Sequence, residues 1–226
     1  TKIAIKGLQK GIPKDLAWLR QESLPMPNWS DGSGQLSQDV LMWWIVQAYK
    51  LKDPAPTPLL RRYAAMLASE SAHALGERVL QAWIAEDTRP PTPEQVAEHV
   101  RTHGGSIMAS AQAMAAYHNQ QQAQTPGQPN TGPQLTAQQW YDRTIEQYRT
   151  TPVGTLIACK GVLAVAAAMG GSQLALLVSQ FLKRWYGLRA AQCKALLQML
   201  AATEHPTAIH VLLATATRFR TAGIRK

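Results

Sequence analysis

The side chains best suited to bind a charged partner are the cations of the last third of the chain. Residues 150–226 contain nine Lys and Arg residues and a single acidic residue, Glu204, whereas residues 1–149 are close to neutral. The residues from which we expect a binding surface are Lys160, Lys183, Arg184, Trp185, Arg189, Lys194, Arg218 and Arg220. A basic surface of this kind favours contact with phosphate groups.

Aromatic rings beside these cations add a second kind of contact. The segments 184–186 (Arg-Trp-Tyr) and 218–220 (Arg-Phe-Arg) combine guanidinium groups with rings, which suits phosphate contact together with stacking on bases or peptides. A structural role fits the same residues: the rings would anchor helix ends in the core, and cations in a last turn would complement the helix dipole. Both interpretations are open on the sequence.

Residues that could catalyse a reaction or bind a metal do not form a known motif. His99 and His103 stand four apart, as two ligands on one helix face would, but Val100 occupies the position where a metalloprotease helix has glutamate. Cys159 and Cys193 lie outside any C-x-x-C pair, and a small buried position suits a thiol as well as an alanine. There is no Gly-rich phosphate loop or nucleophile elbow. We therefore expect no enzymatic activity, no cofactor and no metal site.

The elements that must position these side chains are helices. Good helix formers dominate the composition, and the alternating β-branched runs that are typical of strands are absent. Apolar residues at helical spacing predict two helices, each with one buried face. The apolar residues are Leu36, Val40, Leu41, Trp44, Ile45 and Ala48 in the first helix, and Ala72, Leu75, Gly76, Val79, Leu80 and Trp83 in the second. The predicted fold class is all-α.

Capping signals and composition divide the chain into three parts. Thr-Pro-Glu-Gln at 92–95 and Thr-Ala-Gln-Gln at 136–139 both match a capping box, which marks a helix start. Residues 119–136 are rich in Gln, Pro and Gly, with almost no apolar side chains to offset the entropy of ordering. We predict an N-terminal helical block over residues 1–118, a flexible linker over 119–136 and a C-terminal helical block over 137–226.

An internal repeat with an offset of 34 residues runs through the C-terminal block. Residues 159–168 align with 193–202, and each segment begins with Cys-Lys and continues as an apolar helix. Breaks at 170–172 and 204–206 separate these helices from a second helix in each unit. A helix, a break and a second helix form the hairpin that stacks into solenoids. We therefore predict an α-solenoid of HEAT-like hairpins.

The repeat also predicts where the cations lie relative to one another. Equivalent side chains of stacked repeats are roughly 10 Å apart, the distance between packed helices. Lys160 with Lys194 would form one ladder of positive charge, and Arg184 with Arg218 a second.

The expected compartment is the cytoplasm. The most apolar stretch, residues 153–171, carries Lys160 near its middle, and a charge at the centre of a bilayer costs about 2.5–3.5 kcal/mol. Two cysteines cannot form a disulfide framework and fit a reducing compartment. We expect no membrane association. Thr1 at the start and a helical pattern that runs to Lys226 predict a piece of a longer protein.

Several segments together resemble a known family. They are Lys160 to Ala164, Phe181 to Gly187, Arg189 to Leu197 and Arg218 to Thr221, with further likeness at 12–13, 18–19, 24–25, 34–37, 69–71 and 81–85. These segments resemble the HEAT-like repeat region of bacterial MolR-like proteins, which are named for regulation of molybdate metabolism and often carry a WGR domain. The resemblance covers both helical blocks but not the linker. It implies a scaffold or regulatory module of a large multidomain protein, and no catalytic residues come with it.

Two functions follow as expectations. The first is a non-catalytic scaffold that binds a protein partner or another domain of its parent chain through a surface of stacked hairpins. The alternative is binding of the phosphate backbone of nucleic acid through the basic C-terminal repeats. The two differ in salt dependence, because phosphate contacts release counterions and a packed protein interface does not.

Overall fold

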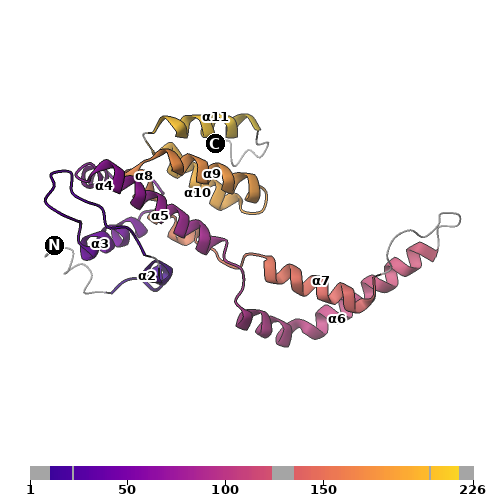
Figure 1. Ribbon diagram of the computed structural model, residues 1–226. Helices are drawn as coiled ribbons and strands as arrows, with labels where there is room; N and C mark the ends of the chain where they lie inside the picture. Colours follow the sequence, from indigo (N-terminus) through magenta and orange to yellow (C-terminus); the bar gives the residue numbers. More distant parts are fainter. Residues whose placement is uncertain (1–10, 22, 124–134, 204, 219–226) are drawn as a thin grey trace. The chain divides into compact units, whose positions relative to one another are not determined.

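The computed structural model describes residues 11–21, 23–123, 135–203 and 205–218. Within these residues all regular elements are helical, and pairing between extended segments is limited to two isolated β-bridges, which confirms the all-α prediction. The helices labelled in Figure 1, with two 3-10 turns, are η1 (Lys14–Leu16), α2 (Ala17–Gln21), α3 (Gln38–Tyr49), α4 (Pro58–Ala64), α5 (Ser69–Asp87), α6 (Pro93–Ala123), α7 (Ala137–Thr150), η2 (Ile157–Val162), α8 (Leu163–Met169), α9 (Ser172–Trp185), α10 (Ala190–Ala201) and α11 (Pro206–Arg218).

The chain forms two compact units whose boundaries differ from the three-part division of the sequence. Unit 1 combines Thr1–Asp87 with Thr155–Lys226, and unit 2 is Thr88–Gly154. The described segments on either side of unit 2 in the sequence therefore belong to one body. The predicted linker also begins within a helix, because α6 continues to Ala123, while its residues 124–134 lie outside the described part of the chain.

The shared core of unit 1 explains why its two segments cannot be separate blocks. Helix α8 is apolar on every side, and its residues from Leu163 to Ala167 are almost completely buried. It packs against α3, α4 and α5 from the first segment and against α10 from the second. A helix that is hydrophobic all round must be covered all round, so the N-terminal helices supply the cover that the C-terminal hairpins lack.

Both predicted apolar stripes lie in this core. The second stripe is buried along its whole length in α5, and Leu75, Val79 and Trp83 are each 0% exposed. In the first stripe Val40 is half-buried and the other members are buried. Gly76 of α5 stands where a Cβ atom would come within 2.8 Å of the Met169 Cβ, so α5 and α8 approach closely at this point.

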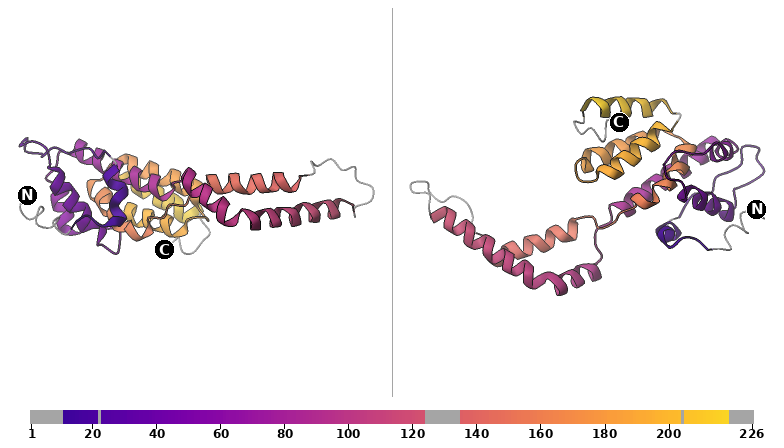
Figure 2. Two further views of the ribbon diagram at one scale, coloured as in Figure 1. Left: turned by 90° about the horizontal axis from the view of Figure 1, so that it is seen from below. Right: turned by 180° about the vertical axis from the view of Figure 1, so that it is seen from behind.

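The C-terminal segment has the helix-break-helix pattern that the repeat predicts. Gly170 and Gly171, with φ of 69° and 116°, end α8 and lead into α9, and a second break leads from α10 into α11. α10 packs against α8, and α11 packs against both α9 and α10. These C-terminal helices lie side by side in both views of Figure 2. One difference from the prediction is that the first repeat begins as the 3-10 turn η2 rather than as an α-helix.

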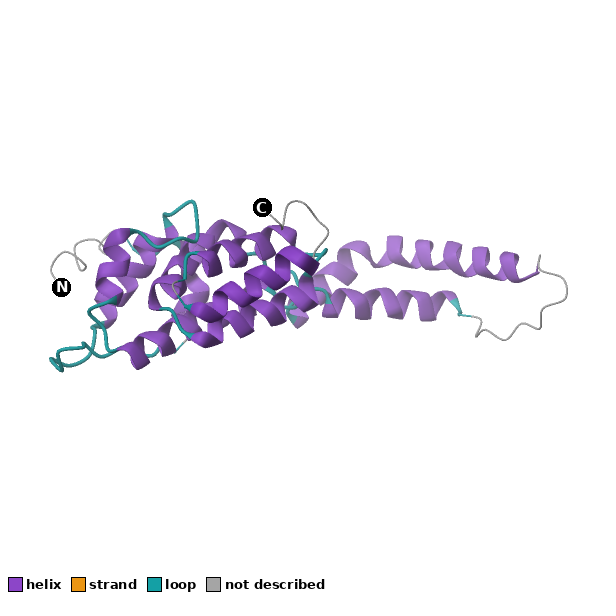
Figure 3. Ribbon diagram, turned by 90° about the horizontal axis from the view of Figure 1, so that it is seen from above, coloured by secondary structure: helices purple, strands orange, loops and turns teal. Residues whose placement is uncertain are grey.

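Unit 2 is a hairpin of two antiparallel helices, α6 and α7 (Figure 3). Both predicted capping boxes are confirmed. The Thr92 hydroxyl accepts from Gln95 N at 3.3 Å while the Gln95 side chain accepts from Thr92 N, and Thr136 and Gln139 repeat this exchange at the start of α7. Few side chains are buried between the two helices, and Ile145 is the buried residue of α7.

Candidate functional site

The predicted basic surface is present in part. Lys183 and Arg184 in the last turn of α9 and Lys194 on α10 are exposed, and no ion pair joins them to a carboxylate within the described ranges. The side chain of Arg218 and the whole of Arg220 lie outside the described residues. The ladder of Arg184 with Arg218 therefore stays a prediction.

Trp185 has the structural role that the sequence allowed, and its part in binding stays a prediction. Its ring is half-buried and packs 6.4 Å from the ring of Phe181, so it anchors the end of α9. The guanidinium carbons of Arg184 and Arg189 lie 5.0 and 5.7 Å from the ring centre, within the range of cation–π attraction. One ring therefore contacts both the core and two cations.

Arg189 does not belong to an exposed binding surface. Its side chain is only 12% exposed, and its Nη1 donates to the Asp87 Oδ2 at 2.7 Å. The other carboxylate oxygen of Asp87 accepts from Leu156 N at 2.8 Å and from the Gln192 side chain at 3.3 Å. A buried carboxylate with three donors is satisfied, so Arg189 serves the core of unit 1 rather than a partner.

The ladder of Lys160 with Lys194 joins two unlike positions. Lys160 is half-buried in the turn η2, whereas Lys194 is exposed on the regular helix α10. The reason lies in Gly161, since a Cβ atom there would stand 2.6 Å from the carbonyl oxygen of Leu51, just beyond the end of α3. The first repeat is in close contact with the end of α3 at this point, whereas the equivalent position of the second repeat is the buried Ala195 on α10, which packs against η2, α8, α9 and α11.

The cysteines and histidines singled out by the sequence lie in structural positions. Cys159 and Cys193 are buried free thiols, and burial raises the pKa of each to about 11. His99 stacks on Tyr148 across the hairpin of unit 2, with ring centres 3.8 Å apart, and lies 4.9 Å from the ring of His103. Within the described residues no three His, Cys, Asp or Glu side chains gather as a metal site would require.

An exposed apolar stripe on α11 was not singled out from the sequence. Ile209 and Leu213 are 58% and 62% exposed. The repeat contains the signal, because the 34-residue offset aligns them with Ala175, which is 4% exposed, and the half-buried Ser179. The equivalent positions are thus more buried on α9 than on α11.

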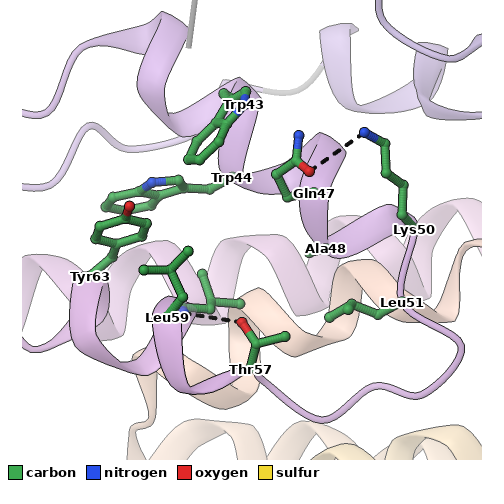
Figure 4. A pocket seen from close by; sticks show the side chains of 10 residues that line it. Trp43, Trp44, Gln47, Ala48, Lys50, Leu51, Thr57, Leu59 and Tyr63 are labelled. Atoms are coloured by element: carbon green, nitrogen blue, oxygen red, sulfur yellow. Dashed lines mark hydrogen bonds between the residues drawn. The ribbon is translucent and has the colours of Figure 1, made fainter. Parts of the chain in front are cut away.

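A pocket between α3 and α4 was also missed. It has a volume of about 350 Å³ and lies beside the rings of Trp43, Trp44 and Tyr63 (Figure 4). Trp44 and Tyr63 are stacked, with ring centres 5.3 Å apart and planes 7° apart. The signal in the sequence is the pair Trp43-Trp44, because adjacent helical residues stand about 100° apart around the axis and Trp43 lies outside the predicted apolar stripe that contains Trp44.

The comparisons with known proteins add no family to this geometry: no family model, no curated protein and no solved structure matches the chain. The class that the structure defines is an all-helical protein. Among the helices of the described ranges, none combines the length and the apolar character needed to cross a membrane.

Proposed function

We propose that this chain is a non-catalytic helical-repeat module, a HEAT-like scaffold that binds a helical segment of a protein partner or of another domain of its parent chain. The observation that supports it is the exposed apolar stripe at Ile209 and Leu213 on α11, whose equivalent positions on α9 are the buried Ala175 and the half-buried Ser179. The resemblance to MolR-like proteins favours a large bacterial parent.

The contact between α9 and α11 indicates what kind of partner the stripe fits. Ser179 and Leu182 of α9 line a groove whose other wall is α11, and Ala175 continues the same stripe one turn earlier. Leu182 is buried there at 2% exposed. Stacked repeats bury each hairpin against the next. The stripe of α9 packs against α11, so the equivalent stripe of α11 suits another helix whose packing surface resembles that of α11.

Addition of a third hairpin tests this proposal directly. A second copy of residues 187–220, inserted after Arg220, carries one whole 34-residue repeat into register. If α11 presents a repeat-docking face, the extended chain gains helicity in proportion to its length, and its midpoint of urea unfolding rises because repeat interfaces add stability. An extended chain with an unchanged midpoint and an unfolded extra segment would rule the repeat stack out.

The matched control changes only the stripe. Ile209→Glu with Leu213→Glu in the original chain should leave stability within about 0.5 kcal/mol, because both side chains are exposed. The same two substitutions in the first copy of the repeat should abolish the rise in helicity and in urea midpoint that the extended chain gains. A gain that survives these substitutions would place the docking face elsewhere.

Binding of nucleic acid is the second candidate, favoured by the exposure of Lys183, Arg184 and Lys194. Fluorescence anisotropy with labelled duplex and single-stranded DNA measures it. Three phosphate contacts on a duplex would give a slope of about 2.7 log units of affinity per log unit of salt. Substitution of the three cations by Gln should then remove binding. The control variant, with Gln at exposed Lys14, Lys52 and Arg62, has the same net charge and should still bind. Absence of binding at physiological salt would rule out the nucleic-acid function and leave the scaffold as the proposed function.

A further inference from the structure

The pocket between α3 and α4 has the size and the lining of a site for a small molecule. Its volume of about 350 Å³ falls within the roughly 300–1,000 Å³ of ligand sites, which are mostly apolar with a few polar groups. Trp43 is tilted by 58° to Tyr63 with ring centres 6.5 Å apart, and Trp44 is stacked on Tyr63. The rings therefore stand at fixed angles along one wall.

The opposite edge of the pocket is polar and positively charged. Lys50 and Gln47 stand there, away from the rings, as Figure 4 shows. The ammonium group of Lys50 donates to the Gln47 Oε1 at 3.5 Å, so the acceptor of Gln47 is engaged and its amide NH₂ is left as a donor. The hydroxyl of Thr57 accepts from Leu60 N and keeps its own proton to donate.

The positive charge of this edge determines which ligand charge the pocket favours. No described residue that lines the pocket is acidic, and Lys50 is the charged one. An apolar wall with a cation and free donors at one edge complements a molecule with an apolar body and a single anionic, acceptor-rich end. A ligand cation, which the rings alone would attract, is disfavoured by the ammonium of Lys50.

We propose that this pocket binds a small carboxylic acid with an aromatic or compact apolar body, whose ring packs against Trp43 and Tyr63 and whose carboxylate meets Lys50 and Gln47. Leu59, 51% exposed at the mouth, leaves the pocket open to such a molecule. The inference is independent of the proposed scaffold function, because neither α10 nor α11 contributes to the pocket.

Two probes of equal shape and different charge test the proposal. Binding of 2-naphthoate and of neutral 2-naphthamide to the whole chain is measured by ligand-observed NMR and calorimetry. We expect 2-naphthoate to bind at one site with a Kd at least tenfold lower than that of 2-naphthamide. Equal affinity for the two probes, or no binding of either, would overturn the proposal.

Variants connect the preference to named residues. Lys50→Gln should raise the Kd of 2-naphthoate to that of 2-naphthamide and leave the amide unchanged, whereas Lys52→Gln, an exposed lysine outside the lining, should change neither. Trp43→Ala should weaken both probes. Far-ultraviolet circular dichroism confirms that each variant is folded. A naphthoate preference that survives Lys50→Gln would show that the anion is held elsewhere.

Discussion

Asp87 is a residue on which several parts of unit 1, far apart in the sequence, converge. It ends α5 and is fully buried, and it accepts hydrogen bonds from Leu156 before η2 and from Arg189 and Gln192 around the start of α10. A buried charge is tolerated only where donors replace the water that it has lost. Through these three donors Asp87 connects the end of α5 to the segments before η2 and around the start of α10.

Asp87→Ala should lower the free energy of unfolding by about 3–5 kcal/mol, because it leaves the guanidinium of Arg189 buried without its carboxylate. Urea unfolding followed by circular dichroism measures the loss. Glu98→Ala removes an exposed ion pair to Arg101 and should cost less than about 1 kcal/mol. In the double variant Asp87→Ala/Arg189→Met part of the loss should return. Equal losses for Asp87→Ala and Glu98→Ala would contradict this role.

Gly161 is required by the carbonyl groups at the end of α3. A Cβ atom would meet the oxygens of Ala48 and Leu51, which are backbone atoms and cannot rotate away. Gly161→Ala should therefore destabilise the protein by about 1–3 kcal/mol, as overpacking does. Gly105→Ala is the control, since nothing lies within 4 Å there and alanine favours a helix by up to about 1 kcal/mol. Thermal unfolding of the two variants should shift in opposite directions, and a shift in the same direction would refute the steric argument.

At the scale of the helix, the sequence predicts interactions between residues that are close in the chain, but not packing between residues that are far apart. The stripes of α3 and α5 and both capping boxes follow from residues three or four apart, so the sequence predicted them and the structure confirms them. The pairing of Arg189 with Asp87 spans 102 residues, and no local pattern marks it. For the same reason the basic surface was predicted to include a side chain that the core uses.

The first turn of α7 depends on Thr136. Its hydroxyl accepts from Gln139 N at 3.2 Å, and loss of such a cap costs about 1 kcal/mol. Thr136→Ala should therefore accelerate hydrogen exchange of the Gln139 amide by about fivefold, measured by NMR. Thr144→Ala is the matched control, because that hydroxyl donates to the Trp140 carbonyl within the same helix. Unchanged exchange at Gln139 in the Thr136 variant would mean that the cap does not hold this turn.

At the scale of the whole molecule, unit 2 is an insertion in the sequence of unit 1. The carboxylate of Asp87 lies 2.8 Å from the nitrogen of Leu156, so the ends of unit 1 on either side of the insertion meet. The two units divide the chain differently from the predicted 119–136 boundary, because composition reports where a chain lacks apolar residues and not which segments share a core.

Replacement of residues 88–154 by a short Gly-Ser linker should leave unit 1 folded. We expect one cooperative thermal transition and retained near-ultraviolet signal from Trp44 and Trp83, both of which are buried in unit 1. Residues 1–87 alone should not fold, because α5 would lose the cover of α8 and α9. A shortened chain without a cooperative transition would show that unit 1 needs the insertion.

The meeting of Asp87 with Leu156 also sets the order in which the protein can fold during synthesis. Leu156, the first of the three partners of Asp87 along the chain, lies 69 residues further on, a length that a ribosome adds in roughly 3–14 s at about 5–20 residues per second. Throughout that interval the apolar stripes of α3 and α5 lack the cover that α8 gives them in the folded chain. Nascent chains of this protein should therefore be substrates for chaperones until the second half has emerged, and protection of α5 should appear late and all at once.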